Sequence, residues 1–129
     1  MGWQKVLDVL VPGNRSWARH APVLALGIAQ HKFERNGKDN KAALHDLGAA
    51  SANLTFEATA RGLTVHQMAG IEPDRAREAF GIPASMEAVT ALAIGYPGGG
   101  EGLDETLAAR DGRPRVRKPL VDLLLYGTL

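Results

Sequence analysis

Two uninterrupted apolar runs of strand length constrain the fold of this chain more than any other feature. They are PVLALGIAQ at residues 22–30 and AVTALAIGYPG at residues 88–98. A strand with one face in solvent alternates apolar and polar residues, whereas a continuous apolar run fits a strand that is covered on both faces. The two runs therefore predict a sheet that lies between layers of other elements.

The strongest helix pattern lies between these runs, at residues 46–62. Asp46 is the expected N-cap and Gly62 the expected residue just past the C-terminal end. The pattern places four apolar residues on one face of the helix: Leu47, Ala50, Leu54 and Ala58. We expect this face to pack against the sheet, although the small residues of the first turns would also suit a second subunit.

Other elements are marked by local signals. A short helix at the N-terminus is expected to stop at Pro12, and a further helical turn should hold Trp17. A short strand is expected at residues 62–68, followed by a helix that starts near Pro73 and ends at Gly81. Without any internal repeat, this loose alternation predicts an α+β layer protein, with residues 1–129 as a single domain.

Composition excludes several classes of function. The formal charge is +1, from 15 basic and 14 acidic residues, and neither sign forms a long block, so a nucleic-acid or membrane partner is not indicated. The absence of cysteine excludes disulfides, thiolate metal sites and a cysteine nucleophile. The N-terminus has no signal peptide or membrane-span pattern, so we expect a soluble, cytoplasmic protein.

Familiar catalytic motifs are also missing. The four histidines lack metal-ligand spacing, the serines lack a G-x-S-x-G setting, and no phosphate-binding glycine loop of the G-x-x-x-x-G-K type is present. Residues 113–119, RPRVRKP, put Arg115 and Arg117 on the same side of an extended segment. Two guanidinium groups in this arrangement suit a phosphate, but on this segment alone a solvated basic turn is the favoured interpretation.

Four stretches of the chain, taken in order, resemble the FMN-dependent nitroreductase family. The stretches are GNRSWARHAPVLALGIA, ALHDLGAASANLTFEATARGLTVHQMAG, REAFGIPASMEAVTALAIGYPG and RPRVRKPLVDLLLYGTL. The resemblance implies a nitroreductase-like layered fold with a mostly antiparallel central sheet flanked by helices. It also implies a homodimer with the flavin at the subunit interface.

The same resemblance assigns roles to particular residues. It places Gln67, Met68, Ala69 and Gly70 against the flavin ring, where backbone N–H groups lie near the reactive N5 atom, and it places Arg115 and Arg117 on the FMN phosphate. FMN would then carry electrons from NAD(P)H to a nitroaromatic, quinone or similar acceptor, without a metal or a catalytic side chain. Whether His66 or Gln67 contacts the substrate is left open.

One difference from the family raises an alternative function. Family members begin with a segment that carries an Arg-x-Ser-x-Arg phosphate motif, and this sequence starts after it, so it corresponds to the C-terminal two-thirds of the family fold. The chain is therefore expected to be an N-terminally truncated member. The alternative is that it is a non-catalytic, dimerising structural or binding domain.

Overall fold

The computed structural model describes residues 2–98 and 102–124. The chain forms two compact units, the first ending at Pro97 and the second beginning at Gly98. The first unit holds seven elements, in the order α1 (Gly2–Asp8), α2 (Pro12–Ala18), β1 (Val23–Gln30), α3 (Ala43–Ala60), β2 (Thr64–Met68), α4 (Pro73–Phe80) and β3 (Met86–Gly95). A single domain over residues 1–129 stays a prediction.

The three strands of the first unit form one antiparallel sheet in the order β1-β3-β2. Both apolar runs of the sequence are strands, and β3, at the centre, pairs with each of the others. The register of β1 on β3 shifts between Gly27 and Ile28, which is a bulge. The structure thus confirms the α+β class with an antiparallel sheet.

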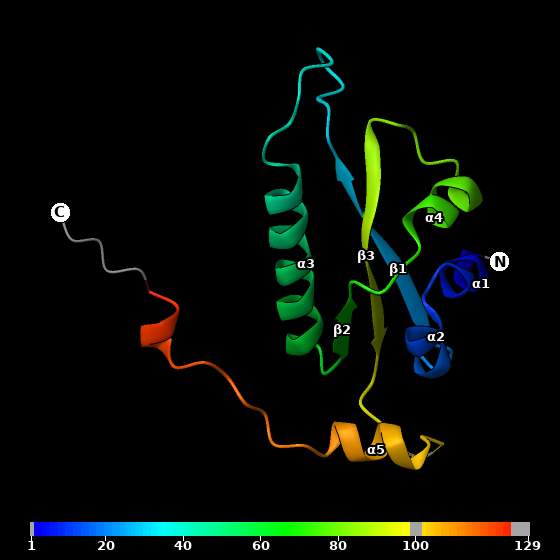
Figure 1. The fold of residues 1–129 in the computed structure, drawn as a ribbon, viewed down its shortest axis with the longest axis vertical. Coiled ribbons are helices and arrows are strands. Elements are labelled where there is room, and N and C mark those ends of the chain that lie inside the picture. The colour runs from blue at the N-terminus through cyan, green and yellow to red at the C-terminus, as the bar shows by residue number, and fades with distance from the viewer. Residues whose placement is uncertain (1, 99–101, 125–129) are drawn as a thin grey trace. The chain divides into compact units, whose positions relative to one another are not determined.

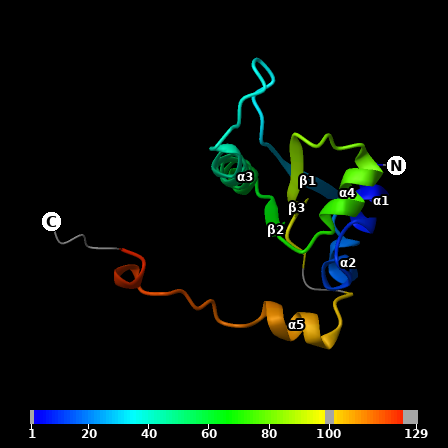
Figure 2. The ribbon, with the colours of Figure 1, turned by 45° about the horizontal axis from the view of Figure 1, so that its top comes forward.

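Helices cover both faces of this sheet, as the continuous apolar runs predict. The long helix α3 packs on one face, while α1, α2 and α4 lie on the other (Figures 1 and 2). The core fills the space between the sheet and these three helices. Its buried residues are Val6, Leu7, Val9, Leu10, Ala18, Leu24, Met68, Ile71, Ala76, Ile82, Ala88, Ala91 and Ala93.

The expected start of the long helix was wrong, and its expected buried face was confirmed at Ala58 but not at Leu54. Helix α3 begins at Ala43, three residues before the expected cap, because Asn40 Oδ1 accepts a hydrogen bond from the Ala42 N–H and turns the chain earlier. The side chains it buries are small, which lets the helix lie close to the sheet, and they are Ala43, Ser51 and Ala58. Leu54, expected to be buried, is 41% exposed.

The short helices follow their proline and glycine signals. Pro12 begins α2 as its first residue, whereas α1 has already ended at Asp8. Pro73 begins α4, and Gly81 ends it in the left-handed conformation with φ of 64°. The Arg77 side chain on α4 donates hydrogen bonds to the carbonyl oxygens of the following turn, those of Ile82, Pro83 and Met86.

The second unit is described by itself. It contains α5 (Glu105–Asp111), whose N-cap Asp104 accepts from the Leu107 N–H at 2.8 Å, and a 3-10 turn, η1 (Leu120–Asp122). Residues 114–119 between them form no helix or strand. In the described ranges of both units, no helix is long and apolar enough to cross a membrane.

Candidate functional site

The loop that follows β2 is held in place by the connection between α1 and α2. Leu10 and Ile71 form an isolated antiparallel bridge. The Val11 N–H donates to the Gly70 carbonyl at 3.1 Å, and the Glu72 N–H donates to the Val9 carbonyl at 2.8 Å. The backbone of residues 69–72 is therefore fixed by chain that lies about sixty residues upstream.

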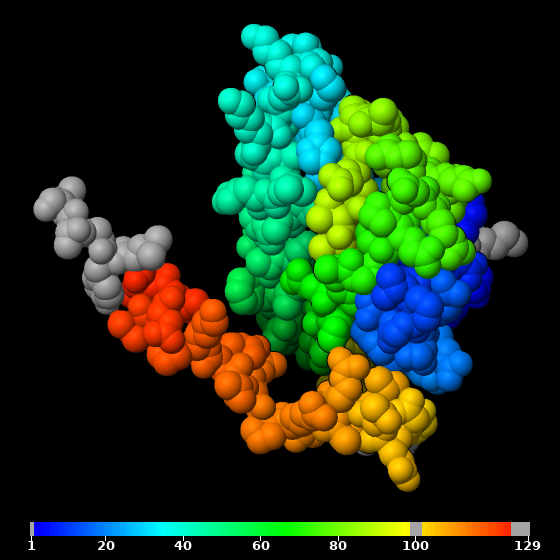
Figure 3. Space-filling view, viewed as in Figure 1, coloured from blue at the N-terminus to red at the C-terminus, as the bar shows by residue number. Residues whose placement is uncertain are grey.

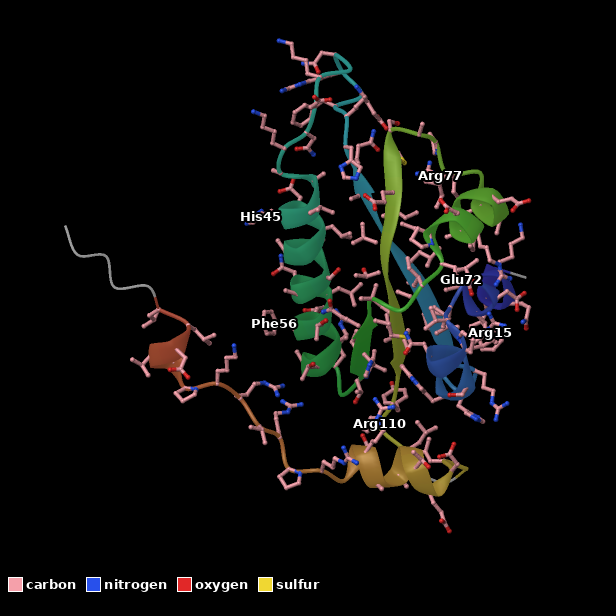
Figure 4. The ribbon with its side chains drawn as sticks, in the orientation of Figure 1. Arg15, His45, Phe56, Glu72, Arg77 and Arg110 are labelled. Carbon is pink, nitrogen blue, oxygen red and sulfur yellow. The ribbon has the colours of Figure 1, made fainter. Side chains whose placement is uncertain are left out.

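Side chains add to these backbone hydrogen bonds, and we call the contacts of residues 9–11 and Asn14 with residues 70–72 the Gly70 clamp. Asn14 Nδ2, on α2, donates a second hydrogen bond to the Gly70 carbonyl at 3.0 Å. Arg15 Nη2 donates to the Leu10 carbonyl at 2.9 Å and lies 3.8 Å from Glu72 Oε1 (Figure 4). The N-terminus of α4 is thus joined to α2 by charge as well as by hydrogen bonds.

Within the loop, one turn leaves two backbone donors unpaired. The Ile71 N–H donates to the Ala69 carbonyl at 2.9 Å, which closes a three-residue γ-turn around Gly70. By contrast, neither the Ala69 N–H nor the Gly70 N–H has a hydrogen-bond partner in residues 2–98 and 102–124. Since Ala69 is exposed, this rigid loop offers unpaired backbone donors to a ligand.

Packing favours glycine at position 70. A Cβ atom there would lie 2.4 Å from Asn14 Nδ2 and 2.8 Å from Val11 Cγ2, both far inside van der Waals contact. The missing side chain lets Asn14 reach the loop and donate to the Gly70 carbonyl.

The other two residues predicted at this loop, Gln67 and Met68, lie on β2 and point to opposite faces of the sheet. Met68 is 4% exposed and belongs to the core. Gln67 Nε2 donates to Thr55 Oγ1 on α3 at 3.0 Å. The nearby His66 ring packs edge-to-face on Trp17, with centroids 4.6 Å apart. That Gln67 and Met68 contact a cofactor stays a prediction, as it does for Ala69 and Gly70.

The predicted phosphate ligands belong to the second unit. Arg115 and Arg117 are both exposed, and Arg117 Nη1 donates only to the carbonyl of its neighbour Val116, at 3.0 Å, among the described residues. Two exposed guanidinium groups can bind an anion. Their place on a phosphate stays a prediction.

Sequence reasoning missed Asn14 and Val11 as parts of this site. Asn14 contacts Gly70 across 56 positions of the chain, and no local pattern marks such a contact. The only signal is the loop itself: a tight, glycine-containing turn after an edge strand needs a partner for its carbonyl groups.

Comparison with known proteins gives the class. The sequence profile of the Nitroreductase family matches residues 4–96. The chain therefore belongs to the nitroreductase family, as the four stretches predicted. The uncharacterized 15.4 kDa protein in the ask 5′ region of Mycolicibacterium smegmatis is 37% identical over 121 residues, which make up 92% of this chain and 78% of that protein.

Solved structures agree with this assignment. A crystal structure of an oxidoreductase containing FMN has a TM-score of 0.88 and 31% identity, over 98% of this chain. A nitroreductase family protein from Clostridium difficile 630 shares the fold, with a TM-score of 0.64 and 22% identity over 98% of this chain. The chain spans 65% of the first of these proteins and 67% of the second.

Proposed function

We propose that the chain is an FMN-dependent oxidoreductase of the nitroreductase type. The observation that carries the proposal is the pair of unpaired N–H groups, Ala69 and Gly70, on a loop whose neighbouring groups are held by hydrogen bonds. Such donors are oriented before a ligand arrives, and a flat heterocycle with ring nitrogens and carbonyl oxygens can accept from them. The FMN-containing structure similar to this chain supports the choice of cofactor.

The proposal gives each predicted site residue a part in binding the cofactor. The Ala69 and Gly70 N–H groups would hold the isoalloxazine ring near N5, with Gln67 and Met68 beside it through their backbone. Arg115 and Arg117 would bind the phosphate, where a charged, planar donor can make two parallel hydrogen bonds. Bound FMN would supply the chemistry, a transfer of electrons from NAD(P)H to a nitroaromatic, quinone or similar acceptor.

We further propose that the protein is a homodimer with the flavin at the subunit interface. Support comes from the outer face of α3, which forms one flank of the first unit (Figure 3). Phe56 and Leu44 on this helix are 72% and 56% exposed, and Phe56 projects away from the sheet (Figure 4). An exposed apolar patch of this kind is typical of a surface that binds a partner.

The first experiment is a visible absorption spectrum of the purified chain, before and after FMN is added and the excess is removed. Retained flavin that NADH or NADPH bleaches is the expected result. A chain that retains no flavin at tens of micromolar would contradict the proposal. It would favour the alternative, a non-catalytic domain that keeps the fold and the dimer surface.

Sedimentation of two matched variants tests the dimer. Phe56→Lys places a charge on the proposed interface and should shift the protein towards monomer, whereas Gln4→Lys adds the same side chain at an exposed position of α1, on the other face of the sheet. Equal sedimentation of the two variants and the unmodified protein would remove this face of α3 from the interface.

A further inference from the structure

A chain of hydrogen bonds ends at the Gly70 N–H. Asn14 Nδ2 and the Val11 N–H both donate to the Gly70 carbonyl. That carbonyl shares a peptide group with the Ile71 N–H, which donates to the Ala69 carbonyl at 2.9 Å. The Ala69 carbonyl in turn shares a peptide group with the Gly70 N–H, which has no partner in the described residues.

Each hydrogen bond in this chain polarises the peptide group that makes the next one. A carbonyl that accepts a hydrogen bond withdraws electron density from its amide nitrogen, so the N–H of the same peptide group becomes a stronger donor. Two such steps connect the Asn14 amide to the Gly70 N–H. The same contacts fix the plane of each peptide group. The Ile71 N–H closes the turn on the Ala69 carbonyl, and Asn14 and Val11 hold the Gly70 carbonyl.

We propose that Asn14 is a positioning residue that sets the direction and donor strength of the Gly70 N–H. Asn14 does this from α2 without contacting the bound ring. Glycine at position 70 is part of the arrangement, since a Cβ atom would occupy the place of Asn14 Nδ2. Asn14 therefore affects how strongly the Gly70 N–H binds any acceptor that reaches the loop.

The consequence for FMN rests on the proposed function. Oxidised flavin accepts a hydrogen bond at N5, whereas reduced flavin carries a hydrogen there. A strong donor facing N5 favours the oxidised form and lowers the midpoint potential. Loss of Asn14 should weaken binding of oxidised FMN more than binding of reduced FMN, and should raise the potential.

The test uses the full chain with Asn14→Ala and Asn14→Asp, and Ser16→Ala as the matched control. Asparagine and aspartate have the same shape, but an ionised carboxylate cannot donate to the Gly70 carbonyl. Ser16 lies on the same helix, is exposed, and bonds only to the Gly13 carbonyl among the described residues. Amide-proton shifts are measured by NMR without FMN, followed by the FMN affinity and the midpoint potential.

We expect the amide protons of Ile71 and Gly70 to move upfield in both Asn14 variants and to stay in place in Ser16→Ala. Oxidised FMN should bind about threefold more weakly relative to reduced FMN, which corresponds to about 14 mV at roughly 30 mV per tenfold change. Unchanged amide shifts would overturn the proposal whether or not FMN binds.

The two proposals can fail separately. If the unmodified protein binds no FMN, the proposed function fails, and the amide shifts still decide the role of Asn14. If it binds FMN with the same affinity and potential in all variants, Asn14 has no part in tuning the site. Loss of the fold in both Asn14 variants would assign this residue to structure alone and would also overturn the inference.

Discussion

Gly70→Ala is the substitution that tests the loop geometry most directly. The added methyl group would lie 2.4 Å from Asn14 Nδ2 and 2.8 Å from Val11 Cγ2, so these side chains, α2 or the loop must move. Overpacking of this kind costs about 1–3 kcal/mol. Loss of the Asn14–Gly70 hydrogen bond adds about 0.5–1.5 kcal/mol. We expect the free energy of unfolding to fall by about 2–4 kcal/mol, a large share of a typical total of about 5–15 kcal/mol.

Urea denaturation followed by circular dichroism measures this loss, and Gly48→Ala is its control. Gly48 lies in α3 with nothing within 4 Å of the position of its Cβ, so alanine there should stabilise the helix by up to about 1 kcal/mol. The same methyl group thus has opposite effects at two glycines. In a double variant with Asn14→Ala, the closest clash disappears, and the combined cost should be less than the sum of the two single costs.

A result in which Gly70→Ala is as stable as the unmodified protein would refute this reasoning. It would mean that the Asn14 side chain moves away freely, and that the hydrogen-bond clamp contributes little. Additive effects in the double variant would point the same way, because additivity is expected only of sites that do not interact.

Three further predictions concern charge and burial. Replacing Arg115 and Arg117 together by alanine should weaken FMN binding by about 1.5–3 kcal/mol for each guanidinium–phosphate hydrogen bond that is removed. Arg110→Ala is the control and should leave the FMN affinity, measured by fluorescence titration, unchanged. Thr90→Val should raise the free energy of unfolding by about 1 kcal/mol, because Thr90 Oγ1 is buried without a hydrogen-bond partner in the described residues; a urea midpoint at or below that of the unmodified protein would contradict this. Arg77→Met should lower the free energy of unfolding by about 2–4 kcal/mol, since three carbonyl groups lose their donor, and an unchanged urea midpoint would show that water replaces the guanidinium at no cost.

Elements with local signals could be predicted from the sequence. The apolar runs predicted β1 and β3, and Pro73 and Gly81 marked the two ends of α4 closely. These signals depend on backbone chemistry that acts within a few residues. The start of α3 was missed because an asparagine upstream of the expected cap, Asn40, turns the chain through its side chain.

The buried face of α3 was predicted only in part, since it depends on which side of the helix meets the sheet. A sequence rich in alanine and glycine has apolar residues on several faces, and Leu54 and Ala50 were therefore assigned to the wrong environment. The loop at Ala69 and Gly70 was predicted as a site through its resemblance to a family motif. The clamp on Gly70 was not, because it joins residues that only the finished fold brings together.

The clamp also has a consequence for the order of events during folding. Its hydrogen bond from Asn14 to Gly70 closes a segment 56 positions long, which contains β1, α3 and β2. Closing a loop of this length has an entropic cost that only the packed sheet offsets. The N–H groups of Ala69 and Gly70 therefore take up their fixed orientation late, when most of the first unit has folded. Refolding intermediates should gain helix and strand structure before they can hold a ligand at this loop, so a bound cofactor would report on completed folding rather than guide its first steps.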